Sequence, residues 1–379
     1  MLKKTIFKTT LWASATAVFM LTSSASCYAS ASSASGSGGL LESLNPVETT
    51  AFGKKKGVKI KMRVQGPSVD LPYEEQFFPR RDVTEGPSDS QLIYADRKRV
   101  ASSDNGDFSF YSFRRGSVRT ADSVSVYGNL RVTSDLFQND LRDVIRLHPS
   151  DAKVRRAAIN YLDSTSTMPL FYFVKGEEME NAYYTRFQAD DGTRYRMMDL
   201  GWYRPTVTRR EYTAQQPDIV WHEAGHALVD AARPDLFSDS PKAGAYHEAW
   251  GDTNAMFTLL THESARKKLI FDVRGDLHQP NFLRSMAEEF GKSVLGTNTG
   301  LRDLDEDVKD NGFVGEVHDK SRVLAGAVYD IVAKAYEDQM RVNGVLPSKA
   351  LGEVADYLRT QWVYTLTLVG VLWKTMSFG

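Results

Sequence analysis

Residues 218–229 have the sequence Asp-Ile-Val-Trp-His-Glu-Ala-Gly-His-Ala-Leu-Val, and this stretch decides how the rest of the chain is interpreted. Residues four apart share one face of a helix, so the imidazoles of His222 and His226 can reach a common point. Glu223 is turned about 100° from His222 on such a helix. Its carboxylate is therefore expected near the shared point without being a ligand there.

Two neutral imidazoles with an adjacent carboxylate base form the HExxH motif of zinc hydrolases. A surface helix with two incidental histidines is the alternative explanation of this pentapeptide alone. A catalytic zinc ion needs a third protein ligand, and the segment Gly244–Asp252 (GAYHEAWGD) offers Glu248. Asp252, four residues further, shares its face and can accept the outer N–H of a ligating histidine.

Two other interpretations of the second segment stay open. Glu248 and Asp252 can instead form a solvated acidic stripe on a surface helix. His247 is a rival third ligand, but it is turned about 100° away from the face that Glu248 and Asp252 share. An all-histidine site would need a histidine six residues after His226, where the chain has Ala232.

Bulk composition limits the class of protein. The 379 residues can hold one large or two medium domains. Their formal net charge of −1 gives no basic surface for nucleic acid, so we expect a pocket, and not a global electrostatic field, to select the substrate. The oligomeric state stays open.

The first residues have the pattern of a signal peptide, expected over residues 1–31. Lys3, Lys4 and Lys8 precede an apolar run over 11–21 and then small residues. This predicts a secreted or periplasmic protein. Cys27, the sole cysteine, allows lipoprotein anchoring as a lesser alternative.

The mature chain is expected to have an α+β fold without transmembrane segments. We predict a flexible Ser/Gly/Lys-rich lead-in at 32–56, a β-rich N-terminal lobe at 57–235 that ends in the histidine helix, and a mainly α-helical lobe at 236–379. Period-two apolar patterns predict strands at 58–64, 108–113 and 170–174, and a hairpin of 183–188 with 194–198. Helical periods predict helices at 121–136, 152–164, 217–232, 243–261, 283–290, 320–342 and 349–366.

Five blocks in sequential order resemble the thermolysin-like neutral metallopeptidases, gluzincins whose third zinc ligand is a glutamate. The resemblance covers roughly residues 115–345. The blocks are Asn181–Tyr184, Asp218–His226, Gly244–Asp252, Leu283–Met286, and Asp310–Gly312 followed by Val317-His318. It implies a two-lobe fold with the zinc helix between the lobes.

The resemblance also implies a zinc endopeptidase that acts on a peptide or protein substrate, with a specific role for each site residue. His222, His226 and Glu248 would hold one zinc ion, and Glu223 would carry the proton from water to the leaving amine. His318 would stabilise the negatively charged oxygen that forms during attack.

The remaining roles concern the substrate and the second histidine. Asn181, the carbonyl of Ala182 and the side chain of Arg284 would grip the peptide backbone. Asp310 would orient His318, with Glu316 as an alternative partner.

Some features depart from the family pattern. Residues 227–245 contain no tyrosine to act as a second oxyanion donor, and Phe237 stands near the expected place. Asp218 matches a family calcium ligand, and residues 303–307 alternate carboxylates, but they lack the turn glycine and closing glutamate of an EF-hand loop. A solvated acidic loop is the favoured explanation, so calcium has weak support. The missing tyrosine, the short leader and the early C-terminus motivate an alternative: a catalytically degenerate, zinc-containing protein that binds a peptide or partner.

Overall fold

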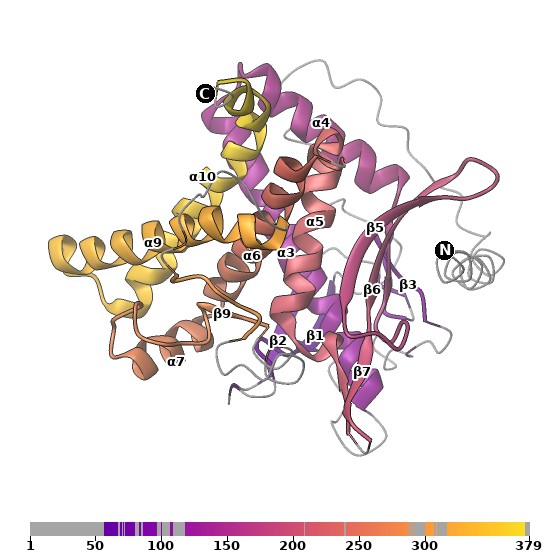
Figure 1. Ribbon diagram of the computed structural model, residues 1–379, viewed down its shortest axis with the longest axis horizontal. Coiled ribbons are helices and arrows are strands. Elements are labelled where there is room, and N and C mark those ends of the chain that lie inside the picture. Colours follow the sequence, from indigo (N-terminus) through magenta and orange to yellow (C-terminus); the bar gives the residue numbers. More distant parts are fainter. Residues whose placement is uncertain are drawn as a thin grey trace.

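The structure is a computed structural model. It describes residues 57–66, 69, 71, 73–79, 83–84, 86–96, 100, 107–108, 118–207, 209–238, 240–287, 291, 300–306, 308 and 317–375. The fold is mixed α and β, with long helices and small sheets (Figure 1). The predicted signal peptide and lead-in lie outside the described residues.

The largest sheet has four strands in the order β3-β4-β6-β5. Strands β3 (Leu92–Tyr94), β4 (Leu170–Phe173) and β6 (Arg194–Leu200) run parallel, whereas β5 (Ala182–Gln188) runs antiparallel to β6. The predicted hairpin of β5 and β6 is confirmed, and Gly192 adopts the positive φ of 86° in its turn. Among the described strands, β5 forms one edge of this sheet and has no strand on its outer side.

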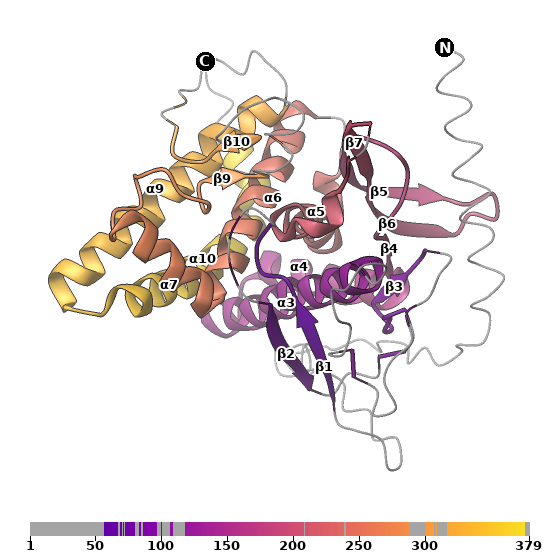
Figure 2. The same ribbon diagram turned by 90° about the horizontal axis from the view of Figure 1, so that it is seen from below.

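Smaller pairs of strands flank this sheet. β1 (Gly57–Met62) and β2 (Glu74–Pro79) pair antiparallel and lie along the long helix α3 (Val118–Leu147), as Figure 2 shows. Gly128 permits this approach, because a Cβ there would lie 2.8 Å from Ile60. β7 (Trp202–Thr206) and β8 (Arg209–Tyr212) form a further antiparallel hairpin.

Helix α5 (Pro217–Ala232) runs through the middle of the molecule (Figure 1). Proline suits its first position, because that N–H would have no helical partner, and Pro234 cannot continue the helix after Arg233. Fourteen of its 16 residues are buried. A helix that is buried all round must be covered on every side, and α5 packs against α3, α4 (Ala152–Thr167), α6 (Pro241–Thr261) and β5.

Two glycines set the distance between α5 and α6. A Cβ at Gly225 would lie 2.9 Å from the Cα of Gly251. A Cβ at Gly251 would lie 2.6 Å from Nδ1 of His222. The two backbones therefore approach more closely than larger residues would allow, and the ring of His222 fills the space beside Gly251.

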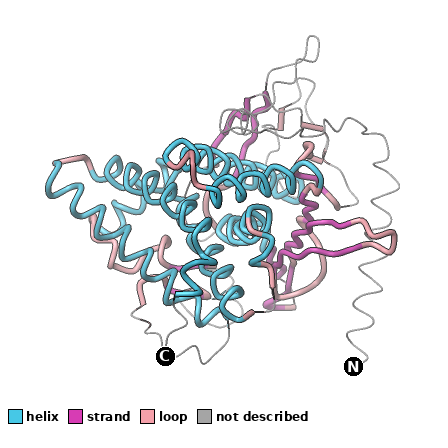
Figure 3. The backbone as a smooth tube through the Cα atoms, turned by 90° about the horizontal axis from the view of Figure 1, so that it is seen from above, coloured by secondary structure: helices cyan, strands magenta, loops and turns pink. Residues whose placement is uncertain are grey.

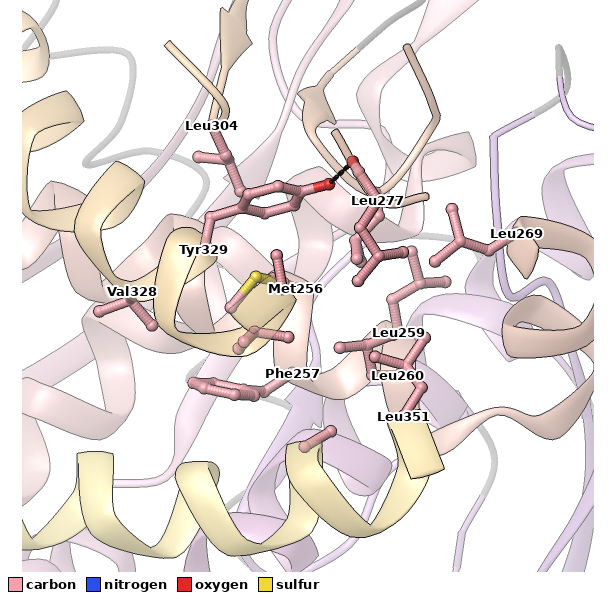
Figure 4. Close-up of a cluster of buried hydrophobic side chains, with 14 of the residues drawn as sticks. Met256, Phe257, Leu259, Leu260, Leu269, Leu277, Leu304, Val328, Tyr329 and Leu351 are labelled. Atoms are coloured by element: carbon pink, nitrogen blue, oxygen red, sulfur yellow. Dashed lines mark hydrogen bonds between the residues drawn. The ribbon is translucent and has the colours of Figure 1, made fainter. Parts of the chain in front are cut away.

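The remaining helices build a second core. They are α7 (Glu263–Val273), α9 (Val317–Asn343) and α10 (Pro347–Thr375), and Figure 3 shows them side by side at the end of the molecule away from β5 and β6. Met256, Phe257 and Val328 pack in this core, where the hydroxyl of Tyr329 donates to the carbonyl of Leu277 at 2.7 Å (Figure 4). Within the described residues no helix is long and apolar enough to cross a bilayer.

Most predicted helices are confirmed, but the one at 283–290 is wrong. Its residues instead form the short strand β9 (Ser285–Met286), which pairs with β10 (Arg302–Asp303), while 288–290 lie outside the described residues. The carboxamide oxygen of Asn281 accepts the amides of Leu283 and Arg284, and Ala287 has a positive φ of 51°. These local bonds replace the helical ones.

The strand predicted at 108–113 lies largely outside the described residues, although Phe108 bridges Ile60. Residues 57–235 contain β1 to β8 and also α3, α4 and α5, so helices contribute heavily to this half as well. The short strands β9 and β10 are the described exceptions to the helical character of residues 236–375.

Candidate metal centre

A cleft of about 220 Å³ opens along α5. Strand β5 forms one wall and the β9–β10 pair forms the opposite wall. The predicted site residues that line it are Asn181, Ala182, His222, Glu223, His226, Glu248 and His318. These seven residues come from four separate stretches of the sequence, which meet at one cavity.

Three potential ligand atoms face one another in this cleft. Nε2 of His222 and Nε2 of His226 are 3.1 Å apart. Oε2 of Glu248, from α6, lies 3.3 Å from the first nitrogen, and Oε1 of the same carboxylate lies 3.6 Å from the second. A tetrahedral ion with bonds of about 2.0–2.1 Å separates its ligands by about 3.3 Å. The three groups could thus hold a metal ion.

The hydrogen bonds around this group also suit a cation. Nδ1 of His222 donates to Oδ1 of the buried Asp252 at 2.8 Å, which directs Nε2 of the same ring toward His226 and Glu248. Oε2 of Glu248 lies 3.3 Å from Nε2 of His222 and 3.2 Å from Nε2 of His318. A metal ion bound among these atoms would displace the proton from Nε2 of His222 and bind both ring nitrogens and the carboxylate, so the residues present fit the ion.

Electrostatics divide the two histidines. Burial opposes protonation of His222, but hydrogen bonds to Asp252 and Glu248 outweigh it and raise the pKa of His222 to about 10. Burial lowers the pKa of His226 to about 3. For Glu248, burial is outweighed by its histidine neighbours, which hold the pKa of its carboxyl well below the usual range. The negative charges of Asp252 and Glu248 thus favour a positive charge at this cluster, whether a proton or a metal ion.

Glu223 lies on the same helix but contributes no ligand atom to the group. Its side chain is buried in the cleft wall, and this burial raises the pKa of Glu223 to about 7, although a hydrogen bond from the backbone of Tyr184 lowers it. A carboxyl with a pKa near neutrality can take up and release a proton at working pH.

The arginine of the cleft is Arg302 rather than the predicted Arg284. Arg302 lines the cleft, and its guanidinium donates to Asp252 at 2.6 and 2.9 Å. The guanidinium of Arg284 is held by Asp303 and Asp305 at 2.7 Å, outside the cleft lining. Arg302 was not predicted because it belongs to no recognisable sequence motif. It reaches the cleft only through the pairing of β10 with β9.

Of the other predicted site residues, some lie near the ligand group and some do not. His318, the second residue of α9, reaches within 3.2 Å of Glu248 with half of its side chain exposed. Asp310 and Glu316, its suggested orienting partners, lie outside the described residues. His247 is buried with its ring centre 5.6 Å from that of His226, and it is not part of the ligand group.

Phe237 does not line the cleft. It packs edge-on against Tyr184 and His247, with ring centres 5.8 Å apart in both cases. Its position therefore supplies no donor for an oxyanion.

The two candidate calcium ligands, Asp218 and Asp305, already bind other groups of the protein. Asp218 accepts the amide of Ala287 at 2.7 Å and thereby ties α5 to the β9 wall. In the predicted acidic loop, Asp305 groups with His278 and Asp330 as possible donors, but Arg284 already binds Asp305.

Compared with models of protein families and with curated protein sequences, the chain matches none.

Proposed function

We propose that the chain is a secreted, zinc-dependent endopeptidase with the two-lobe layout of the thermolysin-like metallopeptidases. The observation that carries this proposal is the tetrahedral spacing of three ligand atoms beside a buried carboxylate in an open cleft. Two imidazoles and one carboxylate are the ligands of catalytic zinc sites that keep a fourth position for water.

Zinc bound by His222, His226 and Glu248 would polarise the scissile carbonyl and lower the pKa of the attacking water toward neutrality. Glu223 would take the proton from that water and deliver it to the leaving amine, since its carboxylate lies in the cleft beside the ligand group. His318 donates to the carbonyl oxygen as negative charge develops there.

Substrate binding in this proposal uses both walls of the cleft. An extended peptide adds to the open edge of β5, beginning at Asn181 and Ala182. From the opposite wall, Arg302 donates to a peptide carbonyl, a role we now assign to it in place of Arg284. A peptide clamped between the walls would approach the water in near-attack geometry.

The test combines metal analysis with a matched pair of variants. We expect one zinc per mature chain and chelator-sensitive cleavage of unfolded casein or a peptide library. Glu223→Gln should keep the zinc and lose activity by about 10²–10⁴-fold, because the base is gone while the ligands remain. Glu263→Gln, at an exposed position on α7, is the control and should retain activity. Wild-type rates in Glu223→Gln would reject the assigned base.

The alternative is a catalytically degenerate zinc protein that binds a peptide or partner in the same cleft. The position of Phe237, where a hydroxyl donor was expected, favours it. Stoichiometric zinc with no turnover of any peptide in the library would select this alternative.

A further inference from the structure

A second cavity, of about 20 Å³, is lined by residues of α3, α4, α5 and the strands β3, β4 and β6. Its volume suffices for one water molecule or one small ion. Its polar lining residues are Gln91, Arg131, Ser134, Tyr161, Thr165 and Arg196. Two arginines thus line this small space, and neither Asp nor Glu is among the lining residues.

Arg196 is a buried cation with an incomplete set of partners. Its side chain is 3% exposed, and its guanidinium donates to the carbonyls of Met168 at 2.8 Å and Ala227 at 3.3 Å. Among the described residues it forms no ion pair. The neighbouring carboxylate of Asp230 is bonded to Arg186 and Tyr184 instead. The charge of Asp230 therefore reaches Arg196 without a direct contact, and an anion in the cavity would compensate this buried cation directly.

Arg131 supplies a second observation. It is 1% exposed, and its terminal nitrogens bind Asp89 at 3.1 Å, Gln91 at 3.0 Å and Asp135 at 3.4 Å. Its Nε is also buried but has no acceptor. The carboxylates of Asp89 and Asp135 bind the terminal nitrogens of Arg131 and do not line the cavity. The Nε–H of Arg131 therefore has no negative partner.

We infer that this cavity binds a monovalent anion of the size of chloride between Arg131 and Arg196. Water would have to donate two hydrogen bonds, whereas an anion only accepts them. The amide of Gln91 is left as a donor because its oxygen already accepts from Arg131, and Nε of Arg131 has no acceptor. The hydroxyls of Ser134, Tyr161 and Thr165 suit water or an anion equally, but two arginines and no carboxylate line the cavity, so its charge favours an anion.

The location gives the anion a structural consequence. Ala224 and Ala227 belong to α5, between and beside the histidines of the metal centre, while Arg131 comes from α3 and Arg196 from β6. A bound anion would join these three elements behind the metal-bearing helix. We expect it to stabilise the fold by binding the folded chain only.

The experiment measures the melting temperature of the wild-type protein in sodium chloride and in sodium gluconate at equal ionic strength. Chloride and bromide should raise it to saturation, whereas gluconate, which is too large for the cavity, should not. Arg196→Met should weaken the chloride midpoint at least tenfold. Arg146→Met, at the exposed end of α3, should respond like wild type.

Crystals grown in bromide should show an anomalous peak between the two guanidiniums. Equal melting temperatures in chloride and gluconate would overturn the inference, as would bromide crystals without that peak. A peak without any chloride response would mark an adventitious ion only and would also count against it. These wild-type measurements decide the matter even if Arg196→Met fails to fold, and none depends on peptidase activity.

Discussion

Nδ1 of His222 lies 2.8 Å from Oδ1 of Asp252, a residue 30 positions further along the chain. The same carboxylate binds the guanidinium of Arg302 at 2.6 Å. One fully buried side chain thus orients a ligand of the candidate metal centre and anchors the arginine of the cleft wall. The metal centre and the β9–β10 wall should therefore respond together when Asp252 changes.

Replacing Asp252 with Asn should weaken zinc binding by about 10–100-fold, because an amide holds the His222 ring less firmly and makes it a poorer ligand. Competition with a chelator of known affinity measures this change. Asp272→Asn, on the exposed side of α7, is the matched control and should bind zinc normally. Unchanged affinity in Asp252→Asn would mean that the ring is oriented by other contacts.

Gly251→Ala should disturb the metal centre without touching a ligand. The added methyl would lie 2.6 Å from the His222 ring, so the ring or α6 must move, at a cost of about 1–3 kcal/mol in the free energy of unfolding. We expect weaker zinc binding and a lower melting temperature. Gly326→Ala on α9, where the nearest atom is 3.3 Å away, should affect zinc binding little. Equal zinc affinities in both variants would contradict the tight packing at Gly251.

Substitutions of Arg302 and Arg284 should have different effects on the kinetic constants. Arg302→Lys should lower kcat/KM by about tenfold or more, since lysine cannot keep two bonds to Asp252 while reaching the substrate. Arg284→Lys should mainly lower stability, because its partners Asp303 and Asp305 lie outside the cleft lining. Steady-state kinetics and urea unfolding of both variants make the comparison. A larger kinetic loss in Arg284→Lys would restore the role predicted from sequence.

Asp199 on β6 should make the fold less stable at high pH. Burial, with the charges of Glu177 and Asp96, raises the pKa of Asp199 to about 7. The folded state therefore keeps a proton that the unfolded chain has lost, and stability decreases as pH rises from about 4 to 7.

Asp199→Asn lacks this titration, so relative to wild type it should gain stability on the order of 3 kcal/mol between pH 4 and pH 8. Urea unfolding of both proteins at these two pH values measures the difference. A pH-independent difference between the two proteins would show that Asp199 titrates normally.

The two halves of the metal-ligand group, the histidine pair and the segment of Glu248 and Asp252, were each predictable because their spacing is local. The spacing of His222 and His226 on a helix, and of Glu248 and Asp252 on another, follows from the helical period alone. The β5–β6 hairpin and most helices were predictable for the same reason, since alternation and turn residues act over a few positions. Zinc, peptidase activity and secretion stay predictions.

What only the tertiary structure decided depends on contacts between distant positions. Arg302 reaches Asp252 because β10 pairs with β9, and Arg284 is drawn away by Asp303, although the local motif favoured Arg284. The pair of buried guanidiniums behind α5 comes from α3 and β6, and neither carries a motif. Periodicity sets which residues share a face, whereas packing alone sets which faces meet.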